Sequence, residues 1–163
     1  PLNPAEQAVV DAVLAERRHL AGALLPLLHG IQDRLGYVPP GAQPVIARAL
    51  HLSRAEVHGV VTFYHHFRQH APGRNVVQIC RAEACQAVGA AALEAHAKKC
   101  LGIDFHETTA DGSVTLEAVY CLGNCAVGPS LRVNDDIVGR VSPERFDGII
   151  AELRAAAKTE VAA

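Results

Sequence analysis

Aromatic and methionine side chains are scarce in this chain of 163 residues. Only 4% of its residues are Phe, Tyr or Trp, and both Trp and Met are absent. Few rings are therefore left to stack on nucleic-acid bases or sugars. The chain also lacks a Lys/Arg block, and its formal net charge is -2. These features argue against nucleic acid or an anionic membrane as the main partner and favour a protein surface.

Long apolar runs are also missing. The longest stretch, residues 21–28, contains Pro26 and is followed by His29, whereas a membrane span needs about 18 apolar residues. The first six residues lack the basic and apolar regions of a signal peptide. We therefore expect an unexported cytoplasmic protein with no direct membrane span. Structural disulfides are disfavoured in that reducing compartment, so metal binding explains the five cysteines better.

The first 72 residues have the hydrophobic spacing of helices. Apolar residues recur every three or four positions after Pro4, and Ser53 with Glu56 forms a capping-box pattern. Gly36, followed by an extended Pro-containing segment, stops one of these helices. We expect about four short helices. The first begins at Pro4, and the next two cover residues 24–35 and 43–50. The last begins at Ser53 and extends to residue 67.

The remaining residues, 73–163, alternate between strand and helix patterns. We expect strands over 75–79 and 113–120, a helix over 88–101, a hairpin of 131–133 with 137–141, and a last helix that begins at Ser142-Pro143 and runs through 149–153. The order β-α-β-β-α is the outline of a thioredoxin-like domain. The predicted fold class is α+β, with an N-terminal helical bundle over 1–72 and a thioredoxin-like domain over 73–163. This outline alone says nothing of function.

Four of the cysteines form two closely spaced pairs. Cys80 and Cys85 are separated by four residues, and Cys121 and Cys125 by three. Each pair follows a predicted strand, and adjacent strand ends would bring the pairs together. A [2Fe–2S] cluster needs two thiolates on each iron, and loops of this length wrap an iron without a helical constraint. These four cysteines are therefore the predicted ligands of one [2Fe–2S] cluster.

Two other metal or redox interpretations compete with this one. A structural zinc site also takes four cysteines at short spacing, but such sites usually hold together domains smaller than this chain. A thioredoxin-type redox pair expects two residues between its cysteines, and neither pair has that spacing. The spacing and the context favour iron–sulfur over zinc, and the zinc-stapled assembly subunit remains the rival from another functional class.

The other candidate ligands show weaker patterns. Cys100 has no partner at ligand spacing, so we expect a half-buried structural thiol and regard a spare ligand as the less favoured alternative. Four histidines lie on or just after one predicted helix, at 58, 65, 66 and 70. His66 and His70 have the i, i+4 spacing of a metal pair, but no third ligand completes a site. We expect these histidines at a surface or subunit interface, and the other five show no constellation.

Several motifs, taken together, give the chain a specific resemblance. They are residues 24–33 with Gly36-Tyr37-Val38-Pro39, residues 53–64, and the two cysteine loops. With these motifs the chain resembles, over nearly its whole length, the 24-kDa-type thioredoxin-like [2Fe–2S] subunits of NADH-oxidising and NAD-reducing complexes. The first cysteine loop, 80–90, and residues 63–68 look most like the gamma subunit of soluble NAD-dependent formate dehydrogenases. The equivalent subunits of complex I and of NAD-reducing hydrogenases are the alternatives.

The resemblance implies partners as well as a cofactor. A partner subunit would bind FMN and NAD(H) beside the cluster, and formate oxidation would occur on a molybdenum cofactor in a larger subunit that also contains iron–sulfur groups. The chain itself has no phosphate-cradling glycine loop and no acid/base constellation. We therefore expect it to have no dehydrogenase activity alone.

Overall fold

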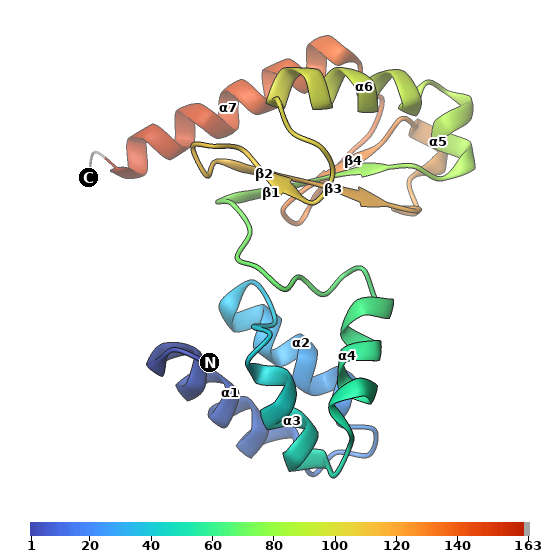
Figure 1. Ribbon diagram of the computed structural model, residues 1–163. Helices are drawn as coiled ribbons and strands as arrows, with labels where there is room; N and C mark the ends of the chain where they lie inside the picture. The colour runs from blue at the N-terminus through green and yellow to red at the C-terminus, as the bar shows by residue number, and fades with distance from the viewer. Residues whose placement is uncertain (162–163) are drawn as a thin grey trace. The chain divides into compact units, whose positions relative to one another are not determined.

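The chain forms two compact units in the computed structural model (Figure 1). They are Pro1–Ala71 and Pro72–Ala163. The structure describes the backbone of residues 1–161 and the side chains of residues 1–156, so the last two residues of the expected second domain lie outside it. Within the described residues, no helix has the length and apolar content needed to cross a bilayer.

The first unit is built of four helices. They are α1 (Pro4–Arg17), α2 (Leu24–Leu35), α3 (Ala42–Leu50) and α4 (Arg54–Phe63). Asn3 and Ser53 each form a capping box with the glutamate three residues later, which satisfies backbone N–H groups at the start of α1 and α4. Gly36 ends α2 in the left-handed conformation, at a φ of 82°.

Apolar side chains, most of them from the four helices, make the core of this unit. Its members are Val10, Val13, Leu14, Ala23, Leu27, Leu28, Ile31, Val38, Ala42, Ile46, Ala47, Val57, Val61 and Phe67. The segment after α4 is held to α2 by the buried side chain of Gln32. This amide donates to the carbonyl of His66 at 2.7 Å and accepts from the N–H of Arg68 at 2.8 Å. Because of this attachment, α4 ends at Phe63 and the chain continues as a non-helical segment, whereas the sequence predicted a helix reaching Phe67.

The second unit contains a five-stranded mixed sheet in the order β2-β3-β1-β4-β5. Its strands are β1 (Asn75–Cys80), β2 (Glu107–Thr108), β3 (Val114–Val119), β4 (Leu131–Val133) and β5 (Asp136–Val138). Only β1 and β3 are parallel, and Cys80 is in register with Val119. This unit therefore confirms the predicted α+β class and the thioredoxin-like order of elements.

Two helices cover one face of the sheet (Figure 1). These are α6 (Ala90–Leu101) and α7 (Pro143–Val161), and they bury Leu93, Phe146 and Ile150 against the apolar side chains of the strands. The core of this unit shares no residue with the core of the helical unit.

The predicted helix over 88–101 differs in the structure. A short helix, α5 (Glu83–Ala87), precedes it, and α6 begins only at Ala90. Gly89 separates the two helices with a left-handed φ of 102°. A helix cannot continue through a residue in this conformation, so α6 starts only after Gly89 rather than at Val88.

Candidate metal centre

The two strands that carry the predicted ligands lie side by side. Because β1 and β3 are parallel neighbours, their carboxyl ends meet at one edge of the sheet, with Cys80 as the last residue of β1. Cys121 follows β3 by two residues. The expected meeting of the two cysteine pairs at adjacent strand ends is therefore found.

The first pair lies inside the unit. Cys80 is 1% exposed and Cys85 is 2% exposed, and both pack with Ala90 in a small apolar cluster. Burial is the main cause that raises the pKa of the Cys85 thiol, while a backbone hydrogen bond from Ser130 opposes it. Cys85 lies on α5, so the expectation of a first loop free of helical constraint is wrong. The Cys85 side chain is in hydrogen-bond contact with that of Cys80.

The second pair lies at the surface. Cys121 and Cys125 are both exposed, and their sulfur atoms are 3.8 Å apart. Two thiolates at about 2.3 Å from one tetrahedral metal are separated by about 3.8 Å, so this pair is spaced for a shared metal ion. The hydrogen bond with Cys121 is the largest cause that raises the pKa of Cys125. A cation between the two sulfur atoms would relieve their mutual repulsion.

The backbone conformation of the second cysteine loop directs an N–H group at a sulfur atom. Gly123, at a φ of 71°, directs its N–H to the Cys121 sulfur at 3.3 Å. Cys121 itself has a φ of 116°, a conformation that is costly for a residue with a side chain and is found at functional sites. A Cβ on Gly128 would lie 3.4 Å from the Cys85 sulfur and 3.0 Å from the Val88 side chain. Ser130 was not identified from the sequence as a backbone donor to Cys85.

The four cysteines fit an iron–sulfur group. They supply four sulfur donors in two pairs on adjacent strand ends, with backbone N–H groups directed at Cys85 and Cys121. Among residues 1–156, only His96, Cys100 and Asp147 place three donor atoms within 4.8 Å of one another. Cys121 and Cys125 would hold one iron atom, and Cys80 and Cys85 the other.

The four histidines singled out from the sequence belong to the helical unit. His58, His65, His66 and His70 are all exposed residues of the helical unit. His58 contacts the Gln43 side chain at 3.1 Å, and the His66 ring lies 5.3 Å from that of His29. None of the four belongs to a group of metal donors among the residues with described side chains.

Known proteins resemble the chain over most of its length. A family model described as thioredoxin-like [2Fe–2S] ferredoxin matches residues 10–154. A subunit of the NADH-quinone oxidoreductase of Pseudomonas aeruginosa is 34% identical over 154 residues, which are 94% of this chain and 91% of the relative. The HndA subunit of the NADP-reducing hydrogenase of Solidesulfovibrio fructosivorans is 33% identical over 131 residues, 80% of this chain and 77% of the relative.

A solved structure agrees with these sequence relatives. The NAD+-reducing [NiFe]-hydrogenase in the H2-reduced state contains a chain that matches 81% of this one with a TM-score of 0.67 and 26% sequence identity. This chain corresponds to only 22% of the length of that hydrogenase chain. By the span of the family match and the identity to its relatives, this chain belongs to the thioredoxin-like [2Fe–2S] ferredoxin family, whose cofactor is one [2Fe–2S] cluster.

Proposed function

We propose that the chain is an electron-transfer subunit that holds one [2Fe–2S] cluster on Cys80, Cys85, Cys121 and Cys125. The observation that carries this proposal is the pairing of β1 with β3, which gathers two cysteine pairs at one sheet edge in a member of this family. When bound, such a cluster accepts or donates one electron at a time.

The two cysteine pairs differ in how far they are exposed to water and to a partner subunit. Cys80 and Cys85 lie in an apolar environment that excludes water from one side. Cys121 and Cys125 are exposed, and the preceding Tyr120 side chain is 66% exposed. We infer that a partner subunit approaches from the side of the second loop. Hydrogen bonds from backbone N–H groups to sulfur and the degree of exposure are the features that tune the potential of such a site.

Cysteine substitutions test the ligand assignment. We expect Cys121→Ser to lose most of its iron or to show a shifted spectrum, because an exposed sulfur ligand is replaced by a weaker oxygen donor. Cys100→Ser is the matched control, since it removes the fifth cysteine, and it should keep two irons per chain. Iron and acid-labile sulfide are measured after anaerobic purification. Full iron content with an unchanged absorption spectrum in Cys121→Ser, or equal loss of iron in both variants, would contradict the assignment.

The zinc-stapled alternative predicts a protein with a different metal content and colour. A structural zinc site closes on four ligands around one ion. The 3.8 Å separation of the Cys121 and Cys125 sulfur atoms suits one shared metal ion of either kind, so the metal content has to be measured. A protein with zinc on these cysteines is colourless and accepts no electron from dithionite. The iron–sulfur proposal predicts a reddish-brown protein that bleaches on reduction.

We further propose that the subunit works in the cytoplasm beside an FMN- and NAD(H)-binding subunit. The relatives bear the names of an NADH-quinone oxidoreductase subunit and an NADP-reducing hydrogenase subunit. The resemblance of residues 63–68 and 80–90 to formate dehydrogenase gamma subunits favours an NAD-dependent formate dehydrogenase as the host, with a larger subunit that carries molybdenum. The quinone oxidoreductase and the hydrogenase are equally compatible with the relatives.

Purification of the native complex through a tag on this chain separates the three hosts. Molybdenum in the complex, with formate-dependent NAD+ reduction, is the result expected for the formate dehydrogenase. Nickel with hydrogen-dependent NAD(P)+ reduction would replace that host with a hydrogenase. A membrane-bound assembly that reduces quinone would replace it with an NADH-quinone oxidoreductase.

A further inference from the structure

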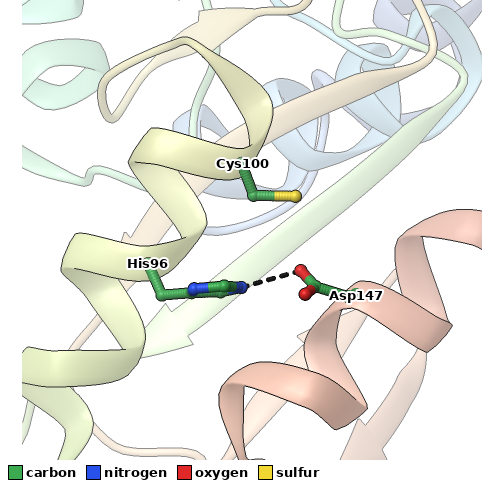
Figure 2. Close-up of side chains that lie close together, drawn as sticks. All are labelled: His96, Cys100 and Asp147. Carbon is green, nitrogen blue, oxygen red and sulfur yellow. Dashed lines mark hydrogen bonds and ion pairs between the residues drawn. The ribbon is translucent and has the colours of Figure 1, made fainter.

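A second group of metal donors lies on two helices of the same unit, separate from the four cysteines. His96 and Cys100 stand on α6 with i, i+4 spacing, which places both side chains on one face of the helix. Asp147 extends toward them from α7 (Figure 2). From the sequence, His96 showed no constellation and Cys100 was expected to be a structural thiol. The structure places Cys100 at the surface rather than half-buried, and α7 supplies a third side chain beside Cys100 and His96.

The three donors converge in space. The Nε2 atom of His96 lies 2.7 Å from Oδ1 of Asp147, and the Cys100 thiol donates a hydrogen bond to the same carboxylate. All three donor atoms are within 4.8 Å of one another (Figure 2). They line a surface pocket of ≈ 410 Å³. The three donor atoms are therefore close enough to share one ion, and solvent reaches them through the pocket.

We propose that His96, Cys100 and Asp147 bind a Zn²⁺ ion, with the fourth coordination position open to the pocket. Nitrogen, thiolate and carboxylate donors are the set that zinc takes in proteins, and three protein ligands with one open position are a known form of its tetrahedral site. This site is separate from the proposed cluster and does not depend on it.

The distances suit this assignment. The donor atoms of a tetrahedral zinc site lie about 3.3–3.6 Å apart, given metal–ligand bonds of about 2.0–2.3 Å. The His96–Asp147 pair would open by about 0.6 Å, and the longest separation would close by no more than about 1.5 Å. Side-chain rotations on two packed helices provide movements of this size. The edge-to-face contact of His96 with the buried Phe146 ring, at 6.2 Å, already orients the imidazole.

A nucleophilic role for Cys100 fits the geometry less well. A reactive cysteine needs a neighbouring base or cation that favours its thiolate. Here Asp147 lies between the thiol and His96, and burial together with the hydrogen bond to this carboxylate raises the pKa of Cys100. A divalent cation reverses the effect, since it attracts the thiolate, the imidazole and the carboxylate to one centre.

The basic residues at the rim limit what the pocket binds. Lys99 and Arg154 line it together with the three donors. An anion would meet these two cations, but it would also meet the Asp147 carboxylate, which accepts hydrogen bonds from both His96 and Cys100. A metal ion is the ligand that uses all three donors at once, and the rim cations can then attract an anionic ligand to its open position.

Zinc binding by the full chain with its iron in place tests the proposal. The protein is equilibrated anaerobically with Zn²⁺ and a weak chelator, and bound zinc and iron are measured together. We expect one Zn²⁺ per chain with no loss of iron. His96→Asn, Cys100→Ser and Asp147→Asn should each weaken zinc binding by at least about tenfold. His106→Asn and Asp135→Asn are matched controls, as both replace exposed side chains of the same unit, and they should bind zinc as the wild type does.

X-ray absorption at the zinc edge provides a second measurement that needs no variant. One sulfur with nitrogen and oxygen neighbours is the expected coordination. A shell of four sulfurs, or zinc uptake only as iron is lost, would assign the metal to the other cysteines and overturn the proposal. No binding by the wild type, or equal binding by the three ligand variants, would overturn it as well.

Discussion

At the residue scale, backbone N–H groups shape the proposed cluster site together with the thiols. The N–H of Gly123 is directed at Cys121, and the N–H of Ser130 at Cys85. The spacing of the cysteines was sufficient to predict that the two pairs lie at the ends of neighbouring strands. It was not sufficient to identify Ser130, because this residue reaches Cys85 only after β4 has paired with β1.

His96 shows a similar limit of sequence reasoning. Its i, i+4 relation to Cys100 was visible in the sequence, but two donors on one helix do not specify a metal site. The third donor, Asp147, is 47 residues beyond Cys100 along the chain and arrives only when α7 packs against α6. Long-range contacts of this kind depend on tertiary packing and leave no local pattern.

Asp111 provides a prediction about acid stability. Its carboxylate accepts hydrogen bonds from the Ser113 hydroxyl and the Thr109 hydroxyl, each at 2.6 Å, and from the Ser113 N–H at 3.0 Å. These bonds hold the pKa of Asp111 far below its usual value of 3.8. A carboxyl group with a lowered pKa in the folded state stabilises the fold above its unfolded pKa, and this contribution is lost as the pH falls.

Asp111→Asn should therefore lower the melting temperature near neutral pH, and its difference from the wild type should shrink below about pH 4. Asp135→Asn is the control, because Asp135 is 97% exposed and its ion pair within the described residues is with Arg132. Thermal unfolding is measured by circular dichroism across this pH range. A difference that stays constant or grows at low pH would show that Asp111 does not act through its charged form.

At the element scale, the predicted elements that the structure confirms have the strongest local signals. The helix over 24–35 has Gly36 at its end, and the α4 start has its capping box. The missed strand β2 has only two residues, Glu107 and Thr108, and both are exposed, so no hydrophobic alternation marks it. Its pairing with β3 is a consequence of the sheet rather than of its own sequence.

A pair of glycine substitutions tests how tightly the second cysteine loop is held. A Cβ on Gly139 would lie 2.6 Å from the carbonyl oxygen of Val127 and 2.8 Å from the Asn124 amide, so Gly139→Ala must displace the segment that carries Cys125. We expect it to destabilise the unit by about 1–3 kcal/mol and to hasten loss of iron to a chelator.

Gly148→Ala is the matched control for this substitution. Gly148 lies in α7, and nothing is within 4 Å of the Cβ that alanine would add. Alanine should stabilise the helix by about 0.5–1 kcal/mol. Urea unfolding and the rate of iron release are compared for the two variants. Similar behaviour of the two would mean that the loop tolerates displacement and that the close approach at Gly139 is not required.

At the scale of the whole molecule, the two units have separate cores, and all four predicted ligands lie in the second. We propose that residues 1–72 and 73–163 are independently folding domains. The 73–163 fragment should retain two irons per chain, and the 1–72 fragment should be helical and free of iron. Circular dichroism and iron analysis of each fragment check this. An unfolded 73–163 fragment would show that the helical unit is needed for the fold of the second domain.

The fold class and the family could be predicted at this scale because helical periodicity, strand spacing and two cysteine loops agree over most of the chain. The formate dehydrogenase host, which rests on the resemblance of residues 63–68 and 80–90, stays a prediction. The matching relatives carry the names of quinone oxidoreductase and hydrogenase subunits.

The central claim is that the four cysteines carry a redox-active [2Fe–2S] cluster. The most direct test is iron, sulfide and zinc analysis of anaerobically purified protein, with low-temperature EPR spectra before and after dithionite. The account predicts two irons and two sulfides per chain, no signal when oxidised and a single S = 1/2 signal when reduced. Zinc in place of iron, with no reducible signal despite anaerobic handling, would contradict it.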